Sequence, residues 1–184
     1  MKIVVLDFET ADTGADSACA LGIVTIEDGV IVDERACLIC PPRKTFLFTD
    51  IHGLTWQDVC HSPKFEDYIP ELNAHMAGAQ YIAAHNAGFD RKVLLSGYGA
   101  AGHNPPFMDT LCTVKLARHA WGLKPTTLPD VCGYFGITLQ HHDALSDARA
   151  CAQILTHAIE QGFPLSRAKL GEPSYHVPVR TLNQ

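Results

Sequence analysis

Near the amino terminus the apolar residues fall in short runs with the spacing of β-strands. These runs cover residues 2–9, 21–27 and 30–40, and runs of this length with turn residues between them predict strands. Asp28 and Gly29 separate the last two runs, and Asp-Gly is a strong hairpin signal. The first run is apolar on both faces as far as Leu6, which predicts a central strand that is covered on both sides.

Later in the chain, helical periods alternate with short apolar runs. We predict strands at residues 81–84 and 107–109, and helices at residues 65–77, 88–98, 110–121, 128–135 and 144–160. A strand meander followed by alternating strands and helices predicts an α/β domain with a mixed sheet, over residues 1–162. Residues 163–184 contain three prolines and no apolar period, so we expect a loosely ordered C-terminal tail.

The composition narrows the class of protein. The 184 residues are 47% hydrophobic and 18% charged, which supplies a core and excludes a disordered chain. A formal net charge of −6 excludes a protein that coats nucleic acid through its overall charge. The apolar runs are too short for a signal peptide or a membrane span, and seven cysteines without a disulfide-like spacing fit a reducing cell interior. We therefore expect a cytoplasmic protein.

Four carboxylates occupy positions where the apolar pattern predicts burial. Asp7 and Glu9 stand at the carboxyl end of the predicted central strand, where ligands bind in open α/β sheets. Asp90 and Asp147 fall on the apolar sides of two predicted helices. Ordinary alternatives exist: the strand could simply emerge into solvent after Leu6, and Asp90 could be a favourable acid in a helix's first turn.

A cluster of four carboxylates is unfavourable without cations. Two carboxylates about 5 Å apart repel each other by about 3 kcal/mol at an effective dielectric constant of about 20. Oxygen ligands favour Mg²⁺ or Mn²⁺ over zinc, and a pair of such ions is a known arrangement for phosphodiester cleavage. The reaction also needs a base for the attacking water. His142 precedes Asp147 by five residues and is the candidate, because the pKa of histidine lies near neutral pH. For the adjacent His141 we expect an ordinary surface position.

Three separated motifs resemble those of a known family. Residues 7–10 read Asp-Phe-Glu-Thr, residues 85–90 read His-Asn-Ala-Gly-Phe-Asp, and residues 142–147 read His-Asp-Ala-Leu-Ser-Asp. In type and order they are similar to the exonuclease motifs of the DEDDh group, which includes the proofreading epsilon subunit of bacterial DNA polymerase III, exonuclease X and ribonuclease T. Residues 51–55, Ile-His-Gly-Leu-Thr, resemble a segment that epsilon-type members carry between the first two motifs.

The resemblance implies a ribonuclease H-like fold, in which the first three strands are antiparallel, the later strands are parallel, and helices flank the sheet. It implies that two divalent cations, Mg²⁺ or Mn²⁺, support hydrolysis of single-stranded or unpaired DNA from its 3′ end to nucleoside 5′-monophosphates. The implied metal ligands are Asp7, Glu9, Asp90 and Asp147, the implied base is His142, and the implied substrate contacts are Thr10, Ile51, His52 and Asn86. The residues alone leave Ile51 open as a buried aliphatic and His52 as a turn residue.

Two other hypotheses share these motifs. Because the metal ions act on phosphate and not on the sugar, the same site would serve a 3′–5′ exoribonuclease that trims RNA. Another hypothesis is a subunit that docks to a DNA polymerase or to a replication or repair partner. The sequence also departs from the epsilon subunits, because Ala-Asp-Thr-Gly at residues 11–14 replaces the Thr-Gly that usually follows the first motif. We therefore expect a different loop after Thr10.

Overall fold

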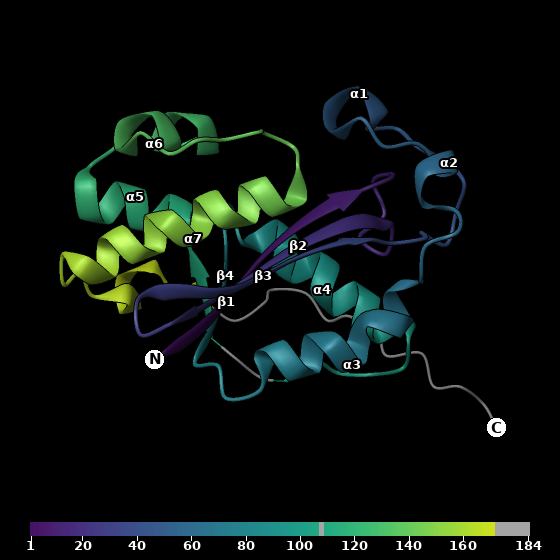
Figure 1. Cartoon of the computed structure of the whole chain (residues 1–184), viewed down its shortest axis with the longest axis horizontal. Helices are drawn as coiled ribbons and strands as arrows, with labels where there is room; N and C mark the ends of the chain where they lie inside the picture. Colours follow the sequence, from purple (N-terminus) through teal and green to yellow (C-terminus); the bar gives the residue numbers. More distant parts are fainter. Residues whose placement is uncertain (107–108, 172–184) are drawn as a thin grey trace.

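The computed structural model describes residues 1–106 and 109–171, and its centre is a five-stranded mixed sheet (Figure 1). The strands are β1 Lys2–Thr10, β2 Ala18–Glu27, β3 Val30–Leu38, β4 Tyr81–Ala84 and β5 Asp109–Cys112. Their order across the sheet is β3-β2-β1-β4-β5. The first three strands pair antiparallel, and β4 and β5 pair parallel to β1. This is the mixed sheet that the sequence predicted.

Helices cover both faces of the sheet. They are α1 Thr49–His52, α2 Trp56–Val59, α3 Phe65–Met76, α4 Gly88–Ala100, α5 Thr113–Trp121, α6 Leu128–Phe135, α7 Ala144–Glu160 and the 3₁₀ helix η1 Leu165–Ala168. In Figure 1, α5, α6 and α7 lie on one side of the sheet and α3 and α4 on the other. No helix in residues 1–106 or 109–171 is long and apolar enough to cross a membrane.

β1 is the central strand and is buried on both faces. Ile3 and Val5 belong to the hydrophobic cluster with α5, α6 and α7. Val4 and Leu6 belong to the cluster with α3 and α4. The four side chains are at most 2% exposed, which confirms the doubly covered strand predicted from the apolar run.

The region around β5 corrects the sequence prediction. The expected strand at 107–109 begins at residues outside the described part of the chain, and the strand that the structure shows runs from Asp109 to Cys112. The expected helix at 110–121 begins only at Thr113. The reason is pairing with β4, which continues as far as Ala84 opposite Cys112. Tertiary pairing therefore overrides the local helical pattern of these residues.

The segment after α7 is better ordered than the sequence suggested. Leu165 and Ala168 of η1 are buried in the core beside α5 and α7. The amide of Leu170 donates to the carbonyl of Thr110 at 2.8 Å, which ties this segment to β5. The expectation of loose order therefore does not hold for residues 163–171, because apolar residues spaced without a regular period still reach the core. Residues 172–184 of the expected tail lie outside the described residues.

Candidate active site

Asp7 and Glu9 extend from the half of β1 that lies beyond β4. The parallel pairing of β1 with β4 ends at Val5 opposite Ala83, whereas the pairing with β2 continues past Glu9. Asp7 and Glu9 lie on the same face of β1 as Ile3 and Val5, which is the face that α7 covers. Because β4 does not pair with this half of β1 and α7 covers its face, both carboxylates lie in a partly enclosed site.

Asp90 reaches the same site from α4. Its side chain is 4% exposed, and its Oδ1 atom accepts a hydrogen bond of 3.0 Å from the amide of Phe8. That amide lies on β1 beyond the last residue paired with β4. Asp90 therefore takes the place of a strand partner, which explains how a residue of α4 comes to lie beside Asp7.

Asp147, in the first turn of α7, completes the cluster. Carboxylate oxygens of Asp7, Glu9 and Asp147 lie within 4.8 Å of one another, a grouping that could hold a metal ion. The Oδ2 atom of Asp147 accepts hydrogen bonds from His141 Nδ1 at 2.8 Å and from the amide of His142 at 3.2 Å. Its Oδ1 atom is buried and has no partner among the described residues. A buried, unpartnered carboxylate oxygen is costly, and a cation would satisfy it.

The raised pKa values of the clustered acids also indicate a cation site. Burial, followed by the charges of Asp90, Asp147 and Glu9, holds the pKa of Asp7 well above its ordinary value. Burial and the charges of Asp147 and Asp90 raise the pKa of Glu9 to about 8. Burial raises the pKa of Asp90 to about 7. Without a cation these acids therefore hold protons near neutral pH, and divalent ions would displace those protons.

Gly22 on β2 allows α7 to approach the sheet closely. It lies opposite Asp7 in the β1–β2 pairing, and a Cβ atom at this position would overlap the backbone carbonyl of Ala144 at the start of α7. The first turn of α7, which carries Asp147, can lie against the sheet only because this residue has no side chain. Sequence inspection did not single out Gly22, because its role depends on a contact between distant segments.

We expect Gly22→Ala to damage the site more than the stability of the fold. Overpacking of this kind costs about 1–3 kcal/mol, and relief of the overlap would move Asp147 away from Asp7. The expected result is a folded protein with a lower melting temperature and at least a tenfold loss of metal affinity. Gly133→Ala in α6 is the control, because a Cβ atom there meets no neighbouring atom within 4 Å. Equal metal affinity in the two variants, measured by calorimetry, would show that the close approach is not required.

The two adjacent histidines have different surroundings. His141 is exposed, as expected for a surface residue, yet its ring also bonds Asp147. That contact was not foreseen. The ring of His142 stacks on that of His141 with centroids 3.8 Å apart, and the backbone of His142 has a positive φ of 68°. Burial and the charge of His141 lower the pKa of His142, so its imidazole is neutral, and able to accept a proton, near neutral pH.

The smaller of two pockets at the site is lined by two of the four expected substrate contacts, Ile51 and His52. It has a volume of about 240 Å³ and is lined by Glu9, Ile51, His52 and His142, among others. Ile51 is 51% exposed, so it is not the buried aliphatic residue that the sequence left open. His52 Nε2 lies 3.3 Å from the carbonyl of Thr10 and donates to it, since a carbonyl can only accept.

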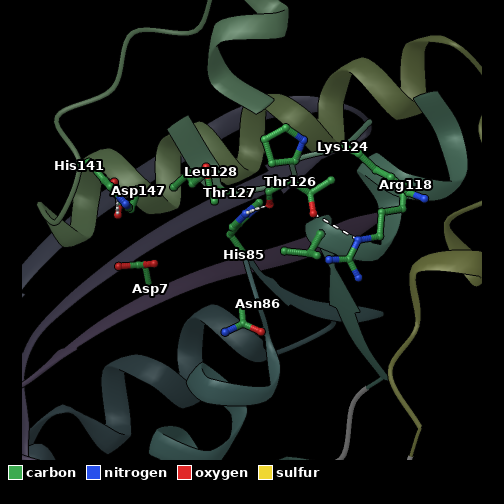
Figure 2. Close-up of a pocket in the computed structure, with 12 residues that line it drawn as sticks. Asp7, His85, Asn86, Arg118, Lys124, Thr126, Thr127, Leu128, His141 and Asp147 are labelled. Atoms are coloured by element: carbon green, nitrogen blue, oxygen red, sulfur yellow. Dashed lines mark hydrogen bonds and ion pairs between the residues drawn. The ribbon is translucent and has the colours of Figure 1, made fainter. Parts of the chain in front are cut away.

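Asn86 lines a different and larger cleft of about 790 Å³. Figure 2 shows Asp7 and Asp147 at one end of this cleft, His85 and Asn86 near its middle, and Arg118 at the other end. Asn86 adopts a left-handed backbone with φ of 64°, a conformation that asparagine tolerates better than most residues. The structure therefore separates the four expected substrate contacts, with Asn86 apart from Thr10, Ile51 and His52.

A carboxylate cluster beside a histidine, at the carboxyl end of a central strand in a mixed sheet, is the arrangement of a metal-dependent nuclease. The family model described as "Exonuclease" matches residues 4–155. The chain belongs to this family, in its DEDDh 3′–5′ exonuclease group, as the three motifs implied.

Two curated relatives support the assignment. The PolC-type DNA polymerase III of Thermotoga petrophila is 33% identical in an alignment of 176 positions that covers 92% of this chain and 13% of the polymerase. Exodeoxyribonuclease 10 of Escherichia coli K12 is 34% identical in an alignment of 141 positions that covers 72% of this chain and 57% of that protein. The chain thus spans about an eighth of the polymerase and little more than half of the exodeoxyribonuclease.

Solved structures share the fold. Exonuclease X in complex with 5′-overhanging duplex DNA is 26% identical with a TM-score of 0.72, covering 90% of this chain and 96% of that one. The nuclease domain of 3′hExo, a DEDDh family member bound to rAMP, is 18% identical with a TM-score of 0.77, covering 89% and 94%. The mixed sheet and its flanking helices have the ribonuclease H-like fold of these nucleases.

Proposed function

We propose that this protein is a metal-dependent 3′–5′ exonuclease that hydrolyses single-stranded or unpaired DNA 3′ ends to nucleoside 5′-monophosphates. The observation that carries the proposal is the convergence of Asp7, Glu9 and Asp147 within 4.8 Å, with Asp90 hydrogen-bonded to the same strand. Relatives named exodeoxyribonuclease 10 and exonuclease X favour DNA as the substrate.

The donor set suits two divalent cations, Mg²⁺ or Mn²⁺. All four side chains offer oxygen, which these ions prefer, and Asp147 presents a buried oxygen that lacks a partner among the described residues. Asp7, Glu9, Asp90 and Asp147 would hold the ions. Once bound, the ions would stabilise the negative charge that develops on the phosphate oxygens during cleavage.

The protein's own residues would supply the proton transfer and hold the substrate. His142, with its pKa lowered, would accept a proton from the attacking water at a ring nitrogen. Ile51 and His52 border the smaller pocket beside Glu9, where the terminal nucleoside would lie. The hydrogen bond from His52 to the Thr10 carbonyl fixes the wall of this pocket before substrate binds.

Product analysis tests the proposal. With Mg²⁺ or Mn²⁺, a 5′-labelled DNA oligonucleotide should yield a ladder of products shortened from the 3′ end, and EDTA should stop the reaction. Equal degradation of an oligonucleotide with a blocked 3′ end would contradict the direction. A matched RNA oligonucleotide belongs in the same experiment, because faster degradation of RNA would favour the exoribonuclease hypothesis.

A second candidate function is proofreading or docking within a replicative polymerase. The similarity to PolC-type polymerases over 92% of this chain favours it. Co-purification of the tagged protein with a DNA polymerase, together with negligible nuclease activity of the isolated chain, would support docking as the main role. Full activity of the isolated chain would favour the independent exonuclease.

We expect metal ions to stabilise the protein, and to do so more strongly at higher pH. Folding raises the pKa of Glu9 from 4.5 to about 8, so the metal-free fold loses stability as pH rises through this window. Mg²⁺ at about one hundred times its dissociation constant should raise the melting temperature by about 5 °C or more. The increment should be larger at pH 8 than at pH 6, because protons compete with the ion. An increment independent of pH, or reproduced by NaCl of equal ionic strength, would contradict the assignment.

A further inference from the structure

The larger cleft connects the carboxylates to a cationic region. Asp7 and Asp147 line one end of it, and Arg118 and Lys124 also line it (Figure 2). The cleft is about 790 Å³, against about 240 Å³ for the pocket beside Glu9 and His52. A single terminal nucleoside needs only the small pocket, whereas the strand that leads to it needs a longer channel. The larger cleft is therefore the candidate path for the strand.

Arg118 has no carboxylate partner among residues 1–106 and 109–171, a property it shares with Arg91 and Arg167, but it is the arginine that lines the cleft. Arg35, Arg43 and Arg149 each form an ion pair with at least one acid. The only hydrogen bond of the Arg118 side chain to a described residue runs from its Nε atom to the hydroxyl of Thr126, at 3.2 Å. Its two terminal amino groups are therefore available to a ligand in the cleft.

The partner of Arg118 is itself fixed in place. Thr126 is buried, and its carbonyl accepts a hydrogen bond of 3.0 Å from His85 Nε2, since a carbonyl can only accept. With its proton on Nε2, neutral His85 accepts at Nδ1 from the hydroxyl of Thr113 at 2.8 Å. His85, directly after β4, and Thr113, at the start of α5, thus fix Thr126 in the loop before α6, and Thr126 binds the Nε end of the guanidinium beside the cleft.

We propose that Arg118, assisted by Lys124, binds a backbone phosphate of the substrate strand on the 5′ side of the bond that is cleaved. This inference rests on the proposed function. A guanidinium is suited to phosphate because it donates two parallel hydrogen bonds with fixed geometry. The contact reads neither base nor sugar, so it would hold DNA and RNA of any sequence. It would also supply local attraction for a strand in a protein whose net charge is −6.

Steady-state kinetics on an eight-residue oligonucleotide tests this role. Arg118→Gln should raise KM roughly ten- to a hundredfold, the equivalent of one charge-assisted hydrogen bond, and leave kcat within about twofold. The slope of log(kcat/KM) against log[salt] should become shallower by about 0.7, the value for one phosphate contact on a single strand. Arg167→Gln is the matched control, because Arg167 is an exposed arginine of η1 that does not line the cleft.

A neutral methylphosphonate, placed at each backbone position in turn, locates the contact. At one position on the 5′ side, the replacement should raise KM for the wild-type protein but not for Arg118→Gln. If the wild-type protein cleaves the oligonucleotide while Arg118→Gln matches Arg167→Gln in KM and salt dependence, the role of Arg118 is overturned and the exonuclease proposal stands. If the wild-type protein cleaves no oligonucleotide, both fail.

Discussion

Asp7→Asn is expected to abolish turnover and, at the same time, to stabilise the metal-free protein. Asp7 lies among Glu9, Asp90 and Asp147, and burial, followed by their charges, raises its pKa well above 3.8. Asparagine has nearly the same shape, cannot ionise and is a poorer ligand for divalent ions. We expect kcat/KM to fall by about 10³-fold or more, the equivalent of about 4 kcal/mol of transition-state stabilisation.

The gain in stability has a defined pH dependence. An acid whose pKa is higher in the folded chain than in the unfolded chain must take up a proton on folding, so it destabilises the fold as pH rises from its ordinary value toward the raised one. Without metal, Asp7→Asn should therefore melt at least about 2 °C above the wild type at pH 7, with no difference near pH 3. Asp33→Asn, at an exposed position on β3, is the control. A less stable Asp7→Asn protein at pH 7 would argue against a strained acid cluster.

His142→Ala is expected to slow the chemical step strongly. Loss of a general base lowers kcat by about 10²–10⁴-fold. Metal affinity should change little, because the proposed ligands are the four carboxylates. At metal concentrations that saturate the carboxylates throughout the pH range, the fall in rate at low pH should also disappear, since the fall that then remains in the wild type reports protonation of the base.

Parallel variants separate the two adjacent histidines. His141→Ala removes the ring that bonds Asp147 and should weaken metal binding more than His142→Ala does. Because His141, His142 and Asp147 also form a group that could hold a metal ion, calorimetry with Mn²⁺ is the decisive readout. If His142→Ala eliminates Mn²⁺ binding, His142 is a ligand and not the base.

Much of the fold could be predicted from local patterns. The two-sided burial of β1 followed from an apolar run ending at Asp7, and the positions of Asp90 and Asp147 followed from helical periodicity. These predictions depend on spacing within one element, which the sequence contains directly. The hairpin at Asp28 also follows from a local signal, as the antiparallel β2–β3 pairing shows.

The remaining features depend on contacts between distant segments. The start of α5 at Thr113 is set by the pairing of β5 with β4, and the order of residues 163–171 by their burial beside α5 and α7. The close approach at Gly22, the bond from His141 to Asp147 and the anchoring of Arg118 by Thr126 arise in the same way. The hydrophobic periodicity of a single helix or strand does not predict such contacts.

Anomalous scattering from Mn²⁺, in crystals grown with Mn²⁺ and a nucleoside 5′-monophosphate, would locate the metal ions of the carboxylate cluster. We expect anomalous peaks within coordination distance of the carboxylates of Asp7, Glu9 and Asp147, with the nucleoside in the pocket bordered by Ile51 and His52. Ordered Mn²⁺ elsewhere in the crystal, with none beside Asp7, would contradict this expectation.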